Sequence, residues 1–136
     1  RSPRIDKILD LNCGKGLRDY LMDDAELPGL LVNPGQDKFV VLPAGRSMEG
    51  STDVLGSPRM KELVQELKKR YPDRYVIFDC PHILDMPDSL IFASYVDAVL
   101  LVVEAGRTSQ EQIRTALETL DNANVLGLVL NKTAAG

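Results

Sequence analysis

The sequence has few of the residues that mark several common classes of protein. It contains no tryptophan, one histidine and two cysteines among 136 residues. Cys13 and Cys80 lie far apart and lack the paired spacing of a zinc site or a disulfide framework, so a reducing compartment, the cytoplasm, is expected. No apolar run approaches the roughly 18 to 20 residues that cross a bilayer, and no signal-peptide pattern is found at the start. The sequence therefore predicts no direct membrane insertion by this chain.

An excess of positive charge is also lacking. The 20 acidic and 16 basic side chains give a formal net charge of -4, and the isoelectric point is near 5.0. Nucleic acids and anionic lipids are attracted by a basic face, so the composition predicts no nucleic-acid partner. Hydrophobic residues make up 44% of the chain and charged residues 26%, which is typical of a single soluble domain spanning residues 1–136.

Short apolar runs are the strongest signals that the sequence does contain. Four runs, at 39–42, 75–78, 98–103 and 125–130, are β-branched or apolar with no polar alternation. Such runs are typical of strands that are buried on both faces of a parallel sheet. Segments with helical spacing separate them, so the expected order is β, α, β, α, β, α, β.

An amphipathic helix is predicted between the first two runs. Its apolar residues recur at i, i+3, i+4 and i+7, while charged residues occupy the other face. Pro58 lies near its start and Pro72 just past its end, as is common for helix boundaries. The apolar face, which we expect to pack on the sheet, consists of Met60, Leu63, Val64 and Leu67.

Three further helices are expected. The motif Thr108-x-x-Glu111 predicts a capping box at the start of one of them. The other two are expected at 17–22 and, starting near Pro87, through Tyr95. The residues of the capped helix that should point inward are Ile113, Ala116, Leu117 and Leu120.

Alternation of strands and helices through short connections predicts an α/β fold. The expected architecture is a layered, mostly parallel sheet with right-handed crossovers and helices on both faces. In such sheets, ligands bind beyond the carboxyl ends of the strands. Chemistry is therefore sought directly after the apolar runs, at residues 43–45, 79–82, 104–106 and 131–132.

Asp79 is the most informative residue of these segments. A carboxylate that ends an apolar strand is well placed to hold Mg²⁺ or its water shell, because Mg²⁺ prefers oxygen ligands and keeps several waters. An aspartate at this place can also have a structural role, as the cap of the following turn. The pattern of apolar residues, Asp79, Cys80 and Pro81 is compatible with both interpretations.

A glycine-rich phosphate loop is absent. The segment Cys13-Gly14-Lys15-Gly16 is the nearest approach to one, but it follows no strand and lacks the serine or threonine that ligates the metal. We interpret it as a turn followed by a helix start.

The order of these pieces resembles the cytoplasmic catalytic domain of bacterial tyrosine autokinases of exopolysaccharide and capsule synthesis. These kinases are related to the partitioning-type ATPases with deviant Walker motifs. The resemblance extends from Arg4 to Lys132. The matching pieces, in family order, are the basic stretch 1–4, residues 16–21, the Leu-Pro-Ala-Gly loop within 41–45, the Walker B stretch 76–81, Asp88, 99–103 with Gly106 and Thr108, and 127–131.

The resemblance implies a P-loop NTPase-like fold and ATP-dependent phosphorylation of tyrosines in the regulation of polysaccharide synthesis and export. The implied cofactors are ATP and Mg²⁺. It also implies self-association in a ring or dimer and a membrane adaptor of polysaccharide export as partner. The expected place is the cytoplasm, at the inner face of the cell membrane.

Site residues follow from the same resemblance by matching position. Asp79 corresponds to the Walker B carboxylate, which helps to hold Mg²⁺ and is a candidate acceptor for the tyrosine proton. Asn131 resembles the residue that such ATPases place beside the adenine. Asp88 is a candidate near the metal, and Arg4 is a candidate near the phosphates.

The sequence also departs from the family pattern. The family's Walker A loop and second Walker motif would precede Arg1, and a tyrosine cluster is missing, so we expect these residues alone to be an inactive part of a kinase domain. His82 stands where the family has a second proline, and we interpret it as a turn residue with a local hydrogen bond. Two alternatives remain: a non-catalytic interaction module of the same fold, and a partitioning-type ATPase.

Overall fold

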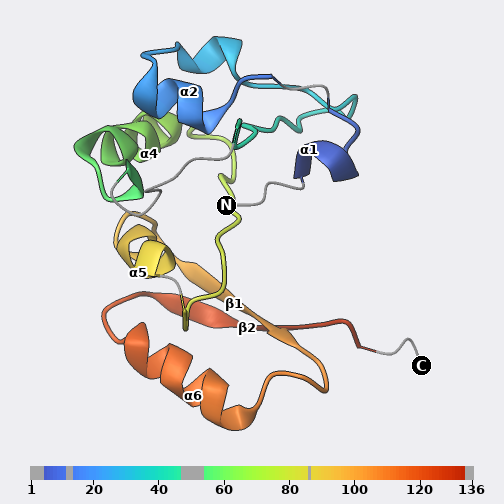
Figure 1. Cartoon of the computed structure of the whole chain (residues 1–136), viewed down its shortest axis with the longest axis vertical. Coiled ribbons are helices and arrows are strands. Elements are labelled where there is room, and N and C mark those ends of the chain that lie inside the picture. Colours follow the sequence, from blue (N-terminus) through green and yellow to red (C-terminus); the bar gives the residue numbers. More distant parts are fainter. Residues whose placement is uncertain (1–4, 12–13, 47–53, 86, 134–136) are drawn as a thin grey trace. The chain divides into compact units, whose positions relative to one another are not determined.

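The structure is a computed structural model that describes residues 5–11, 14–46, 54–85 and 87–133, without the side chains of residues 6, 87 and 88. The chain divides into two compact units, Arg1–Val54 and Leu55–Gly136. Figure 1 shows the helices of the first unit in blue and the sheet of the second in orange and red.

The described residues of the first unit form two short α-helices and one turn of 3₁₀ helix. They are α1 (Ile5–Ile8), α2 (Leu17–Met22) and η1 (Leu27–Gly29). The bounds of α2 agree with the sequence prediction. Tyr20, Leu27 and Leu30 of this unit are buried.

The prediction of a strand at 39–42 is wrong. Only Val41 has a ladder partner, in an isolated antiparallel bridge to Val32, with both N–H···O distances 2.8 Å. Phe39 and Val40 are exposed. A strand needs a neighbour along its whole length, and the described residues of this unit supply one only at Val32.

The second unit is built on two parallel strands. They are β1 (Val99–Glu104) and β2 (Val125–Asn131), joined by α6 (Gln110–Thr119). In the register of this pair, Leu101 lies beside Leu128 and Glu104 beside Asn131. A parallel pair connected through a helix is the βαβ unit of an α/β fold, so the predicted fold class is confirmed.

The helix α4 (Pro58–Arg70) begins and ends where the sequence predicts. Ser57 caps it, since the Oγ of Ser57 accepts a hydrogen bond from the Met60 N–H at 3.3 Å. Three basic residues occupy its last turn, where they complement the negative end of the helix dipole. The predicted apolar face is buried: Met60, Leu63, Val64 and Leu67 are at most 7% exposed.

The predicted start of α6 is wrong by one residue. Ser109, not Thr108, is the N-cap: its Oγ accepts from the Gln112 N–H at 3.1 Å, and Gln112 Oε1 accepts from the Ser109 N–H at 2.9 Å. The Thr108 hydroxyl accepts instead from the Glu104 N–H at 3.1 Å, at the end of β1. Leu117 is 39% exposed, so its predicted inward position is also wrong.

The helix α5 (Pro87–Ala93) is shorter than predicted because it ends before Tyr95. The run 75–78 that precedes it is extended but belongs to no strand. Tyr75 is fully exposed and Ile77 is 89% exposed. The prediction of strands buried on both faces is therefore wrong among the described residues, and Leu100, Val102, Leu126, Leu128 and Leu130 of the two observed strands are exposed as well.

Candidate functional site

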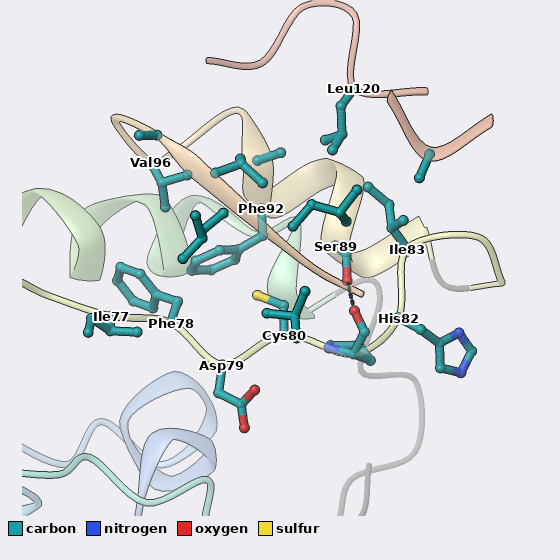
Figure 2. Close-up of a pocket in the computed structure, with 18 of the residues that line it drawn as sticks. Ile77, Phe78, Asp79, Cys80, His82, Ile83, Ser89, Phe92, Val96 and Leu120 are labelled. Carbon is teal, nitrogen blue, oxygen red and sulfur yellow. Dashed lines mark hydrogen bonds between the residues drawn. The ribbon is translucent and has the colours of Figure 1, made fainter. Parts of the chain in front are cut away.

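Asp79 lies in an extended segment that aromatic packing holds in place. The ring of Phe78, one residue earlier, lies 4.7 Å from that of Phe92 of α5, with the two planes tilted by 60°. Phe92 is buried. Successive side chains of an extended backbone point to opposite sides, so packing of Phe78 turns the carboxylate of Asp79 away from α5, as Figure 2 shows.

A second contact holds the segment on the other side of Asp79. The hydroxyl of Ser89, in α5, donates a hydrogen bond of 2.7 Å to the carbonyl oxygen of Pro81. Phe78 and Pro81 thus fix the backbone one residue before and two residues after Asp79. Its carboxylate is exposed and has no hydrogen bond or ion pair with any described residue.

Cys80 is turned to the opposite side from Asp79. Figure 2 shows its sulfur directed toward the apolar side chains around Phe92. Cys80 is exposed, but partial desolvation of its thiol, and secondarily the negative charge of Asp79, raise its pKa above the usual range. The thiol therefore stays protonated at neutral pH and lacks the thiolate character of a nucleophile.

His82 has a local partner, as the sequence predicts. Its Nδ1 lies 3.3 Å from Oδ2 of Asp85, and both side chains are exposed. Figure 2 shows the ring directed away from the apolar side chains of this region. An exposed pair three residues apart is typical of a turn, so His82 remains outside the candidate chemistry.

A hollow of about 1420 Å³ opens beside Asp79, and we call it the Asp79 hollow. Residues 74–85 line it together with β1 and with side chains of α5 and α6, among them Phe92 and Ile113. Asp79, Glu104 and Thr108 all contribute to its wall. The structure therefore brings Asp79 and the carboxyl end of β1 to the wall of one hollow.

Asn131 lies at the carboxyl end of the neighbouring strand. It stands beside Glu104 in the strand register, and its carbonyl oxygen accepts from the Ala105 N–H at 2.9 Å. It is not among the residues that line the Asp79 hollow. Asp79 and Asn131 therefore lie in the same unit, but only Asp79 lines the Asp79 hollow.

Glu104 lies in a segment where the sequence places chemistry, but sequence reasoning assigns it no role. Its Oε1 accepts a hydrogen bond of 3.0 Å from Nζ of Lys132, and its Oε2 lies 3.6 Å from Nη1 of Arg107. The hydrogen bond from Lys132 lowers the pKa of Glu104, and the positive charges of Lys132 and Arg107 lower it further. Partial desolvation of the carboxylate acts in the opposite direction and raises the pKa. The carboxylate is therefore ionised at neutral pH. One feature of the sequence could have indicated this ion pair: the acidic Glu104 follows the apolar run 98–103, and the basic Lys132 closely follows the run 125–130.

The described residues fit Mg²⁺ only if a bound nucleotide and water supply most of its ligands. No group of three or more metal-ligating side chains occurs among the described residues. Asp79 offers one unengaged hard-oxygen ligand, and Mg²⁺ in nucleotide sites commonly takes one or two carboxylates together with phosphate oxygens and water. Asp79 is accordingly the described residue suited to hold it.

The structure does not describe the side chains of the other predicted site residues, Arg4 and Asp88. Arg4 belongs to residues 1–4, which the structure does not describe. Asp88 is the second residue of α5, but its side chain is not described. Both remain predictions.

The segment Gly14-Lys15-Gly16 is a turn and helix start, as interpreted from the sequence. Gly16 is the N-cap of α2, and its N–H donates a hydrogen bond of 2.7 Å to the carboxylate of Asp19, which is 3% exposed. The Leu17 N–H donates to the Pro43 carbonyl oxygen at 2.7 Å. The Gly16 amide is thus engaged by Asp19 of the same helix, and the Leu17 amide by the Leu-Pro-Ala-Gly loop of the same unit.

Comparisons with known proteins find relatives over nearly the whole chain. It is 32% identical over 138 residues to the succinoglycan biosynthesis transport protein ExoP of Rhizobium meliloti, covering 98% of this chain and 17% of ExoP. It is 29% identical over 120 residues to the tyrosine-protein kinase CpsD of Streptococcus agalactiae, covering 87% of this chain and 52% of CpsD. No family model matches the sequence.

A solved structure supports the same relationship. The kinase domain of VpsO superposes with a TM-score of 0.90 at 26% identity, over 98% of this chain and 66% of that domain. The chain spans about half the length of CpsD and about a sixth of ExoP. No helix among the described residues is long and apolar enough to cross a membrane.

Proposed function

We propose that this chain, which belongs to the family of bacterial tyrosine kinases, forms part of an ATP-dependent protein-tyrosine autokinase that regulates exopolysaccharide synthesis and export. The observation that carries the proposal is the position of Asp79. Its carboxylate is exposed, unengaged by any described residue, and fixed by Phe78 and Pro81 at the rim of a large hollow. This arrangement is suited to binding a ligand that approaches from solvent.

Asp79 has two roles in this proposal. Its carboxylate oxygens would hold Mg²⁺, whose positive charge would offset that of the phosphates of ATP. The same carboxylate orients the acceptor tyrosine and accepts its phenolic proton as the phosphoryl group is transferred to the phenolic oxygen. Both roles need a charged, solvent-accessible carboxylate on a fixed backbone, which Asp79 supplies.

The remaining site residues act on other parts of the nucleotide. We place Asn131 beside the adenine, Arg4 near the phosphates, and Asp88 near the metal. Position at the carboxyl end of a parallel strand supports the assignment of Asn131, since ligands of α/β sheets bind at that edge. Arg4 and Asp88 rest on the resemblance of the sequence alone.

The whole protein is further proposed to self-associate as a ring or dimer and to bind a membrane adaptor of polysaccharide export at the cytoplasmic face of the membrane. The names of the curated relatives support the kinase over the partitioning-type ATPase, because CpsD is named a tyrosine-protein kinase. ExoP is named a transport protein of polysaccharide biosynthesis, which supports the export context. Residues 1–136 are proposed to be the C-terminal part of a single nucleotide-binding kinase domain.

The test is the substitution Asp79→Asn in the complete kinase. It removes the charge at the metal site and changes little volume, so we expect autophosphorylation to be lost and the free energy of unfolding to change by less than about 0.5 kcal/mol. Asp85→Asn is the matched control, because Asp85 is an exposed carboxylate of the same segment that pairs only with His82 among the described residues. It should leave autophosphorylation near the wild-type rate. Near-normal autophosphorylation by Asp79→Asn would remove Asp79 from the mechanism.

A further inference from the structure

Two backbone edges without a partner face the Asp79 hollow. The sheet of the second unit has two strands, so the edge of β1 that is turned away from β2 pairs with no strand of the described chain. Residues 75–80 are extended, but they form no backbone–backbone hydrogen bond with any described residue. Both segments line the hollow. Its walls therefore carry two rows of N–H and C=O groups with which a further strand can pair.

The side chains on these two edges are apolar and exposed. Tyr75 is 100% and Ile77 89% exposed, and they lie on one face of the extended segment because alternate residues share a face. On β1, Leu100 is 55% and Val102 60% exposed. All four side chains line the hollow. Exposed apolar side chains gathered in one place mark a surface that another segment of protein covers.

The size and chemistry of the hollow fit a strand better than a small ligand. Its volume is about 1420 Å³. Pockets for small molecules typically have roughly 300 to 1,000 Å³ and contain a few convergent polar groups. The runs 75–78 and 99–103, which line this hollow, contain only aliphatic and aromatic residues. A strand supplies backbone donors and acceptors to both edges and apolar side chains to both walls.

The remainder of the kinase domain is a source for such a strand. Residues 1–136 superpose on the VpsO kinase domain over 98% of their length but cover only 66% of that domain. About a third of a kinase domain with the same fold therefore has no counterpart in these residues. A segment of this remainder can fill the hollow within one molecule, without a second copy.

We propose that the Asp79 hollow is an interface inside the complete kinase, filled by an apolar β-strand from the part of the kinase domain outside residues 1–136. This strand pairs with residues 75–78 on one side and with β1 on the other. The inference rests on the proposed function, in which residues 1–136 are one part of a larger kinase domain. Asp79 follows the paired run, so its carboxylate stays at the rim of the filled hollow.

The proposal gives the run 75–78 the neighbour that its composition requires. These residues are aliphatic or aromatic, yet among the described residues no strand pairs with them. A strand inserted beside them makes the run a member of the sheet, because a strand forms where a neighbour pairs with it. In the complete kinase, the side chain of Ile77 is then buried and the amides of this run exchange slowly with solvent.

The first measurement is amide hydrogen exchange of the complete, nucleotide-free kinase, read on proteolytic peptides. Residues 75–78 should exchange at least about tenfold more slowly than the exposed turn at 35–38. This protection should persist when the kinase is diluted until a mass measurement shows monomers. Exchange of 75–78 as fast as that of the turn overturns the proposal. Protection that disappears on dilution also overturns it, because a second copy then fills the hollow.

The second measurement is urea unfolding of the complete kinase with the substitution Ile77→Lys. A lysine at a buried sheet position should clearly lower the midpoint, although Ile77 is exposed in residues 1–136 alone. Ile8→Lys is the matched control, because Ile8 is 77% exposed in α1 and does not line the hollow. It should leave the midpoint near the wild-type value. A wild-type midpoint in Ile77→Lys overturns the proposal.

Autophosphorylation of the same preparation separates this inference from the proposed function. Fast exchange at 75–78 in a kinase that autophosphorylates overturns the inference alone. Slow exchange at 75–78 in a kinase that does not autophosphorylate contradicts the proposed function and still supports a strand in the hollow.

Discussion

Gly16 lies directly against the carbonyl group of Pro43, so that a Cβ atom on residue 16 would overlap the carbonyl oxygen of Pro43. The same oxygen accepts the hydrogen bond from the Leu17 N–H, and the next carbonyl, of Ala44, accepts from the Arg18 N–H at 3.1 Å. The start of α2 and the Leu-Pro-Ala-Gly loop are thereby joined through backbone groups. The backbone of Gly16 is extended, with φ of −174°, and any residue could adopt it. Glycine is therefore required here by the close approach of Pro43 and not by the backbone conformation.

Gly16→Ala should therefore destabilise the protein. The added methyl group must displace backbone atoms, and overpacking of this kind typically costs about 1 to 3 kcal/mol. Gly14→Ala is the matched control, because a Cβ at residue 14 would meet nothing within 4 Å. Urea unfolding of the complete kinase measures both variants. Equal midpoints for the two would show that the contact between Gly16 and Pro43 does not exist in solution.

The buried face of α4 predicts a larger loss of stability. Leu63 is 0% exposed, so Leu63→Ala removes a side chain from a filled interior and should cost about 2 to 5 kcal/mol. Leu117→Ala makes the same change within α6 at a position that is 39% exposed, and it should cost clearly less. A loss below about 0.5 kcal/mol for Leu63→Ala would mean that this face is exposed, and a partner-binding role of α4 would then be reconsidered.

The cap of α6 is tested at Ser109. Ser109→Ala removes the acceptor of the Gln112 N–H and should lower the free energy of unfolding by about 1 kcal/mol. Ser109→Asp keeps an acceptor at the N-cap and adds a charge that favours the helix dipole, so stability should be retained. If both variants unfold at the wild-type midpoint, Ser109 is not the cap.

The helices could be predicted from sequence because their signals are local. The bounds of α2 and α4 follow from periodicity and from flanking residues within one turn. The error at α6 has a physical cause, since Thr108-x-x-Glu111 and Ser109-x-x-Gln112 satisfy the same motif. The Glu104 N–H binds the Thr108 hydroxyl and leaves the cap to Ser109. Only the tertiary position of β1 decides between them.

The strand predictions and part of the site depend on contacts that periodicity does not specify. The run 75–78 has the composition of a strand, but a strand forms only where a neighbour pairs with it. Asp79 could be predicted because its position after an apolar run is visible in sequence. The pair of Glu104 and Lys132 could not, because it requires the register that sets Glu104 beside Asn131.

The last prediction concerns the exposed apolar residues of the second unit. Tyr75 is fully exposed and Ile77 is 89% exposed, in an extended segment outside the observed sheet. An extended apolar segment with free backbone groups is a template for pairing with another chain. We therefore expect a protein of residues 1–136 alone to self-associate. We expect it to bind no ATP, because the described amides of the 14–16 segment do not form a phosphate loop and Gly16 is engaged by Asp19.

Mass measurement in solution tests the predicted self-association, and calorimetric titration with Mg-ATP tests the predicted absence of ATP binding. Ile77→Lys places a charge on the exposed segment and should shift the protein toward the monomer, as charged residues do at natural sheet edges. Asn122→Lys adds the same charge at an exposed turn between α6 and β2 and should leave the association unchanged. Micromolar ATP binding by a monomer of these 136 residues would contradict both halves. Gly14, Lys15 and Arg46 would then be the first candidates for a phosphate site.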